Sequence, residues 1–192
     1  MYVMECKFKG LVHCMINRYP MPEKQGERKK KRKLELKDKV YLDKKGMYIP
    51  ADNIRMMLIG NQFRKGAAEI LGKYIESKRG AEYRTFCQSC VWVVGKEDPE
   101  KVYFEPKRKI WDATDVRSFV TANKNRDIVE RPLVCTPWSL AFLIHVVDDN
   151  FPPEKIKELF EVAGLRCGVG VYGPKFGRCL VDYCKVVESK KK

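Results

Sequence analysis

The segment from residue 163 to residue 184 combines flexible backbone with positive charge. It reads AGLRCGVGVYGPKFGRCLVDYC, and its five glycines stand among Arg166, Lys175 and Arg178. Glycine lets backbone approach a ligand closely, and exposed N–H groups can hold phosphate. A helix cap and a tight turn explain only some of these glycines. The spacing also differs from the G-x-G-x-x-G of dinucleotide sites. We therefore interpret this segment, with Gly168 and Gly170 at its centre, as an anion-binding loop.

A run of cations supplies a second potential contact with phosphate. It comprises Arg28, Lys29, Lys30, Lys31, Arg32 and Lys33. Prolines and a glycine surround the run, so we interpret residues 18–46 as a basic loop or arm. Such side chains bind a nucleic-acid backbone with a strong dependence on salt. A solvated loop is the alternative, and the clustering of the charge favours phosphate contact.

Two aromatic residues, Tyr172 and Phe176, lie inside the glycine-rich segment. Most aromatic side chains of a domain belong to its core. An exposed ring beside cations is also a platform on which an unpaired base can stack. The position of these two rings among glycines and cations favours stacking.

Catalytic chemistry has few candidates, because the chain contains only two histidines. Metal-free cleavage of RNA needs an acid–base group near the phosphate. His13 is the candidate for that role, and His145 lies in an apolar run typical of a core strand. Nothing else in the sequence assembles around His13, so we expect a protein without catalysis.

Metal binding rests on Cys87-x-x-Cys90 alone. Structural zinc takes four ligands, and no second C-x-x-C pair is present. In a strand the two thiols would also face opposite sides. We therefore expect neither a metal nor another cofactor.

Composition narrows the class of partner. The chain has 192 residues, 39 Lys and Arg against 25 Asp and Glu, and a net charge of +14. This surplus favours a polyanion, and above all a nucleic acid. No apolar run approaches the roughly 20 residues that cross a bilayer. We expect one soluble, cytoplasmic domain over 1–192 with no membrane partner, whose eight cysteines stay reduced.

Hydrophobic periodicity and Pro/Gly positions indicate an α+β fold. The expected elements are a strand over 2–16, a helix over 48–80 that glycines weaken near 65, a strand over 84–95, an inserted hairpin over 99–134, a strand over 138–149, a helix over 151–164 and a strand over 178–187. This order is the β-α-β-β-α-β pattern of ferredoxin-like (RRM-like) domains, with two helices on one sheet face. The other face and the loops would then be available to a ligand.

Several of these residues resemble the RAMP superfamily of RNA-binding proteins, which includes backbone and processing subunits of CRISPR effector complexes. The start of the long helix resembles that family at Ile49, Pro50, Ile54 and Arg55, and the loop before the last strand resembles it at Gly168, Gly170, Phe176, Gly177 and Arg178. The resemblance covers most of the chain. One departure is that ADNIRM stands where the family has G-S-S-(L/I)-(R/K)-G.

The resemblance implies a non-catalytic protein that binds single-stranded RNA, or single-stranded DNA, without sequence preference. Asn53 and Arg55 would join the loop and the basic arm in contacting phosphate. Copies would associate along one RNA or with CRISPR-complex proteins, in antiviral defence. Two alternatives remain: a RAMP-type endoribonuclease that uses His13, and a virus-borne, anti-CRISPR-like protein that docks on or mimics a defence complex.

Overall fold

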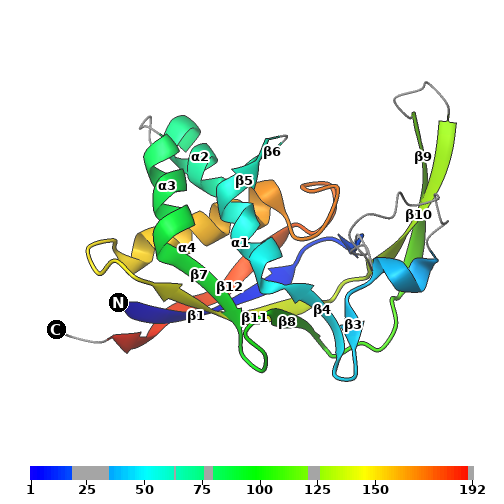
Figure 1. Ribbon diagram of the computed structural model, residues 1–192, viewed down its shortest axis with the longest axis horizontal. Coiled ribbons are helices and arrows are strands. Elements are labelled where there is room, and N and C mark those ends of the chain that lie inside the picture. The colour runs from blue at the N-terminus through cyan, green and yellow to red at the C-terminus, as the bar shows by residue number, and fades with distance from the viewer. Residues whose placement is uncertain (19–34, 63, 76–79, 121–125, 190–192) are drawn as a thin grey trace, which may run out of the picture.

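A computed structural model gives the positions of residues 1–18, 35–62, 64–75, 80–120 and 126–189 (Figure 1). The strands are β1 Tyr2–Gly10, β2 Cys14–Met15, β3 Leu42–Asp43, β4 Gly46–Pro50, β5 Gly60–Asn61, β6 Arg64–Lys65, β7 Val91–Gly95, β8 Lys101–Glu105, β9 Ala113–Val120, β10 Arg126–Val134, β11 Ser139–Val146 and β12 Cys179–Ser189. The helices are α1 Ala51–Ile59, α2 Ala67–Ile70, α3 Gly80–Cys90 and α4 Pro153–Val162. The described part of the chain is thus mixed α+β.

The main sheet has the strand order β12-β1-β11-β8-β4-β3, and β7 also pairs with β11. Each recorded pairing is antiparallel. Strands β7 and β8 lie one after the other along the same edge of β11, because Ile144 pairs with Val93 while Leu140 pairs with Phe104. The predictions for the strand at 138–149 and the final strand are confirmed by β11 and β12.

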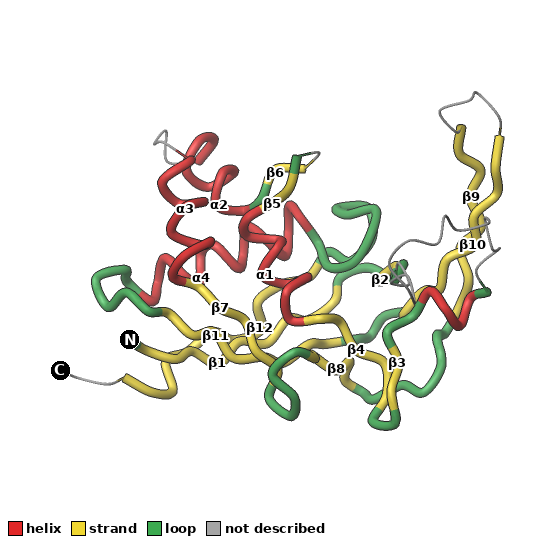
Figure 2. Tube along the Cα trace, viewed as in Figure 1, coloured by secondary structure: helices red, strands yellow, loops and turns green. Residues whose placement is uncertain are grey.

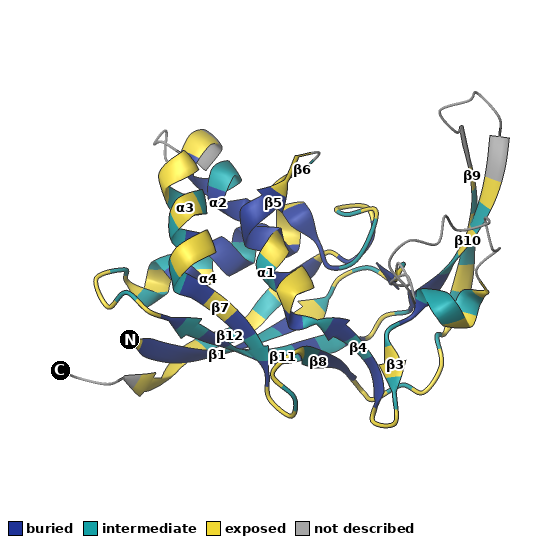
Figure 3. Cartoon of the chain, viewed as in Figure 1, coloured by how far each residue is buried: buried dark blue, intermediate teal, exposed yellow. Residues whose placement is uncertain are grey.

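The helices cover one face of this sheet, and the core lies between the two layers (Figures 1 and 3). Strand β11 alternates buried and half-buried residues, as a strand with one covered face must. Phe8, Phe142 and Phe160 meet at the centre of the core, with the rings of Phe8 and Phe142 5.1 Å apart. The opposite face of the sheet, called the open face below, carries no helix among the described residues.

The predicted helix over 48–80 is wrong as a single element. Helix α1 ends at Gly60, whose φ of +74° stops a right-handed helix. The chain then turns back through the β5–β6 hairpin. A Cβ on Gly66 would lie 2.2 Å from the carbonyl oxygen of Leu58, so the glycine is needed for this close return. The described residues therefore contain four α-helices rather than the expected two.

The predicted strand over 84–95 is also wrong in its first half. Residues up to Cys90 belong to α3, and only Val91–Gly95 form a strand. The rings of Phe86 and Phe151 stack at 3.9 Å, and the ring of Tyr83 meets Phe151 edge-on. Tyr83 and Phe86 are three residues apart, so in a helix both rings can pack on Phe151. This packing stabilises the helix despite the β propensity of the segment.

A two-stranded ribbon, β9–β10, stands apart from the helices (Figure 1). Its base pairs with β2, where Met15 lies opposite Leu133. The expected hairpin is thus present, although its turn at 121–125 lies outside the described residues. The ribbon begins at Ala113, whereas β8, which we expected to belong to the insertion, is part of the main sheet. None of the described helices is long and apolar enough to cross a membrane.

Candidate nucleic-acid interface

The glycine loop, defined here as residues 168–178, connects the end of α4 to β12 and lies between the helices and the ribbon (Figure 2). Its glycines are required by internal packing. A Cβ on Gly170 would lie 2.3 Å from the carbonyl oxygen of Met15, and one on Gly177 would lie 1.8 Å from that of Val169. Both residues also have φ above +70°. Close approach of backbone to backbone within the protein explains these glycines.

Several amides of the glycine loop bond inside the protein. Val169 donates to the carbonyl of Gly177 at 2.9 Å, Val171 donates to that of Met15 at 3.0 Å, and Gly177 donates to that of His13 at 2.8 Å. These N–H groups are therefore not available to phosphate. The predicted anion-binding site made of loop amides is therefore absent among these residues, because their hydrogen bonds hold the loop against β2. An anion would have to bind the neighbouring side chains instead.

The tip of the loop carries an exposed aromatic ring between two arginines. Tyr172 is 44% exposed, and the guanidinium carbons of Arg131 and Arg117 lie 4.8 and 5.7 Å from the centre of its ring. Both arginines come from the ribbon. Phe176, which we expected to stack on bases, is only 9% exposed and packs with Met15 and Leu133 instead. Tyr172 is thus the available platform, and Phe176 fastens the loop to the base of the ribbon.

A groove of about 210 Å³ opens beside the loop. It is lined by Ile16, Asn17, Tyr41, Ile49, Asn53, Met56, Met57, Gly60, Asn61, Arg64, Lys65, Cys167, Gly168, Gly170 and Val171. The predicted residues Asn53, Gly168 and Gly170 therefore come together here. Sequence reasoning missed Arg64, because nothing in the chain indicates that the β5–β6 hairpin reaches the loop.

Buried guanidinium nitrogens without an acceptor lie on both sides of the loop, and two others, Arg84 Nε and Arg108 Nη1, belong to arginines outside the loop and the groove. Arg64 Nη2 and, on the ribbon, Arg131 Nε and Nη1 are buried with no hydrogen-bond partner among the described residues. Arg64 lies against the loop, since a Cβ on Gly173 would be 2.4 Å from its Nη2. A buried donor without an acceptor is costly, so each such group calls for a ligand or another explanation.

Arg55 does not join this groove. Its Nε donates to the carbonyl of Val91 at 2.9 Å, its Nη2 donates to that of Gln88, and its guanidinium lies 4.1 Å from the ring centre of Trp92. The side chain thereby bonds the last turn of α3 and the start of β7. This arrangement indicates a structural role at that end of the sheet.

The remaining predicted cations surround the loop. Arg166, Lys175 and Arg178 are exposed, the first in the turn after α4 and the other two within the loop. The run Arg28 to Lys33 lies outside the described residues. The described chain before it ends at Arg18, whose amide donates to the carbonyl of Lys39 and whose neighbour Asn17 lines the groove.

His13 is exposed, and its ring is held in one tautomer. The amide of Thr136 donates to His13 Nδ1 at 3.1 Å, so the proton of the neutral ring is on Nε2. The outward nitrogen of the neutral ring is then a donor and cannot act as a general base. Among the described residues, no other titratable side chain forms a hydrogen bond with this ring.

Cys87 and Cys90 lie one turn apart in the last part of α3, on a helix rather than the expected strand. Burial raises the pKa of Cys87 to about 12, which keeps this thiol protonated and makes it a poor metal ligand. Within the described residues no group of three or more His, Cys, Asp or Glu side chains is placed to hold a metal ion.

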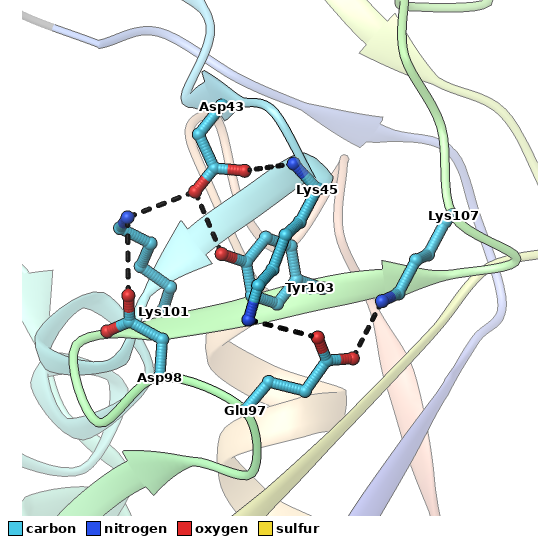
Figure 4. Close-up of polar contacts among 7 residues, drawn as sticks. All are labelled: Asp43, Lys45, Glu97, Asp98, Lys101, Tyr103 and Lys107. Carbon is cyan, nitrogen blue, oxygen red and sulfur yellow. Dashed lines mark hydrogen bonds and ion pairs between the residues drawn. The ribbon is translucent and has the colours of Figure 1, made fainter.

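The open face of the sheet has many charges, and they pair with one another. Lys7 Nζ lies 2.8 Å from Glu105, and Lys96 bonds Glu5. At the β3–β4 edge, a network joins lysines and carboxylates (Figure 4). Its members are Asp43, Lys45, Glu97, Asp98, Lys101, Tyr103 and Lys107.

Asp43 lies at the centre of this network. Burial disfavours its ionised form, but hydrogen bonds from Lys101 Nζ at 3.0 Å and Tyr103 Oη at 2.8 Å outweigh that effect and lower its pKa to about 2. The pKa of Lys101 is raised, because its ammonium group bonds the carboxylates of Asp43 and Asp98. The lysines at this edge therefore already have acceptors, and phosphate would have to displace them.

Comparison with known proteins does not assign a family to this arrangement. No protein-family model matches the chain, and no curated protein matches it.

Proposed function

We propose that the protein binds single-stranded nucleic acid, RNA by preference, at the surface formed by the groove and the tip of the glycine loop. This surface, called the loop-side interface, comprises the groove together with Arg64, Arg117, Arg131 and Tyr172. The observation that carries the proposal is a pair of arginines with buried nitrogen atoms that lack an acceptor: Arg131 beside the exposed ring of Tyr172, and Arg64 against Gly173 of the same loop. Phosphate and base oxygens are the acceptors that such groups bind in nucleic acids.

The ring of Tyr172 favours a single strand over a duplex. A base can stack on an aromatic ring only when it is free of its own pairing partner. The arginines beside the ring would contact the backbone, which is the same for every sequence. The loop-side interface is therefore suited to an unpaired strand.

The arrangement of strands supports a ferredoxin-like fold of the RAMP type as part of this proposal. The order β12-β1-β11-β7/β8 places the first strand between the last strand and β11, with helices between β1 and β7 and between β11 and β12. A split β-α-β pattern has this arrangement. The glycine loop then precedes the last strand, as in the resemblance.

Association of copies along one strand is the second part of the proposal. The ribbon exposes apolar side chains on the face turned away from the glycine loop: Val116 is 59% and Ile128 is 66% exposed. Exposed apolar surface of this kind is typical of contact sites. A neighbouring copy on the same RNA, or a base next to the ribbon, would cover it.

The alternatives receive less support. Nδ1 of His13 already accepts a hydrogen bond from Thr136, and no other titratable side chain among the described residues bonds this ring, so the endoribonuclease has no second catalytic group beside His13. No observation on the described residues favours docking on a defence complex over binding of a strand. A protein of that kind would co-purify with a protein target and would bind RNA weakly by itself.

Fluorescence anisotropy with a labelled single-stranded RNA tests the proposal. We expect binding that weakens linearly in log salt and is stronger than binding to a duplex of the same sequence. Tyr172→Ala should weaken binding by about tenfold, because base–aromatic stacking contributes ~1–3 kcal/mol. Tyr172→Phe is the matched control and should bind like the wild type. Equal affinity of Tyr172→Ala and Tyr172→Phe, or no RNA binding, would contradict the proposal.

A further inference from the structure

The groove has a composition that phosphate binding alone does not require. Its floor is apolar, with Ile49 and Met57 buried. Its lining also includes Asn17 and the exposed Asn53. Phosphate contacts are normally built from cations and amides on an open surface. An apolar floor with polar groups on its rim is instead typical of a site that encloses a flat, partly polar ligand.

The size of the groove limits what it can enclose. Sites for drug-sized molecules measure roughly 300–1,000 Å³. The groove measures about 210 Å³ and therefore admits a fragment of that size class, such as a single heterocyclic ring system. A folded peptide or a whole dinucleotide would not fit.

Arg64 gives the groove a chemical preference. Its guanidinium is a donor without any acceptor capacity, and the Nη2 that lies against Gly173 has no partner. Adenine has no exocyclic oxygen, and the edges it presents combine donors with acceptors. Uracil, guanine and cytosine each carry a carbonyl oxygen. The carboxamides of Asn17 and Asn53 can donate or accept, so they are compatible with any base. The guanidinium of Arg64 can only donate, and it therefore determines which base is preferred.

We propose that the groove takes one unstacked nucleobase of the bound strand and favours a base with a carbonyl oxygen, which uracil, guanine and cytosine have, over adenine. The inference rests on the proposed function, because the base is delivered by a strand that the loop-side interface holds. Arg64 would donate to the carbonyl oxygen, and Asn53 would bond the remaining polar edge. Met57 and Ile49 would contact the face of the ring. Binding of the strand would then not be independent of sequence.

The test compares three labelled RNA oligomers of about 12 nucleotides, a length suited to one compact binding site. They are oligo(U), oligo(A) and an abasic ribose–phosphate strand, measured by anisotropy at about 50 mM salt, where backbone contacts remain strong. We expect oligo(U) to bind about tenfold more tightly than oligo(A), since one good side chain–base pairing discriminates by ~1–3 kcal/mol. The abasic strand should bind more weakly than either, because it also loses the stacking on Tyr172.

Two variants connect that preference to the groove. Arg64→Met keeps the aliphatic stem, and Asn53 is exposed, so we expect Asn53→Ala to fold like the wild type. We expect either variant to reduce the ratio of oligo(U) to oligo(A) affinity to within about twofold, a loss of most of the discrimination from one pairing. Lys157→Met on α4 removes one exposed charge away from the groove and should keep the full ratio.

The outcomes separate this inference from the proposed function. If oligo(U) and oligo(A) bind equally tightly, or if neither Arg64→Met nor Asn53→Ala changes the ratio, the base site is wrong while strand binding stands. If none of the three oligomers binds, both the base site and the proposed function are wrong.

Discussion

The open face of the sheet and the loop-side interface are both rich in cations, but they differ in how those cations are paired. On the open face, Lys7, Lys96 and Lys101 each contact at least one carboxylate. At the loop-side interface, Arg64 and Arg131 have buried nitrogen atoms without an acceptor. Exposed ion pairs contribute little to stability, but each lysine in such a pair already has a carboxylate as its partner. The proposed function therefore depends on how the cations are paired, rather than on how many there are.

The two regions also differ in how their backbone is held. The open face belongs to a sheet whose ladder is regular across β1 and β11. The glycine loop has no ladder, and it is fixed by bonds from Val171 and Gly177 to the segment around β2 and by close contacts at its glycines. A substitution that the sheet tolerates should therefore be damaging in the loop.

The largest expected effect is on the stability of the loop. Gly177→Ala adds a Cβ at 1.8 Å from the carbonyl oxygen of Val169 on a residue with φ of +72°. We expect the free energy of unfolding to fall by about 3 kcal/mol, from backbone strain and overpacking together. Urea denaturation measures it. Leu180→Ala on an exposed position of β12 is the control, with a change within about 0.5 kcal/mol. A loss below about 1 kcal/mol for Gly177→Ala would show that the loop adapts.

The sharpest test of the comparison removes two cations from each region. Arg64→Met with Arg131→Met should weaken binding of single-stranded RNA roughly 30-fold, because both arginines have nitrogen atoms without an acceptor in the protein and each would form a charged contact with the strand. The slope of log affinity against log salt should also fall by about 1.4. Lys7→Met with Lys96→Met removes the same charge from paired positions, so we expect affinity within about twofold of the wild type. Equal losses for the two double variants would remove the distinction between the regions.

The smallest expected effect concerns acid stability of the network in Figure 4. The pKa of Asp43 is about 2 in the folded protein, and an unfolded aspartate titrates near ~3.9. A folded pKa below the unfolded one stabilises the fold above pH ~4, and that contribution is lost as pH falls toward ~2. Asp43→Asn should therefore lower stability at neutral pH, with a difference from the wild type that shrinks between pH ~4 and ~2.

Thermal unfolding of both proteins across this pH range measures the difference. Binding of RNA by Asp43→Asn at neutral pH should stay within about twofold, because this edge is paired within itself. A constant difference in stability at all pH values would show that Asp43 does not titrate with the fold.

Much of the sheet could be predicted because its signals are local. The alternation in Ser139–Val146 and the prolines and glycine around α4 indicated a strand and a helix where the structure has them. The first half of the segment 84–95 could not be predicted, because the ring of Phe151, far along the chain, decides that Phe86 belongs to a helix. Propensity is a weak guide where packing between distant residues is strong.

Of the candidate site, the sequence by itself indicated the charge surplus, the glycine loop before β12, and Tyr172, Asn53, Gly168 and Gly170 as members. Only the tertiary structure decided that Phe176 is buried, that Arg55 bonds α3, and that Arg64 and Arg131 lie beside the loop without acceptors. Composition and spacing are properties of neighbouring residues, and they report conformational preference and charge. Pairing and burial depend on which distant segments the core brings together, and that is settled by the packing of the whole chain.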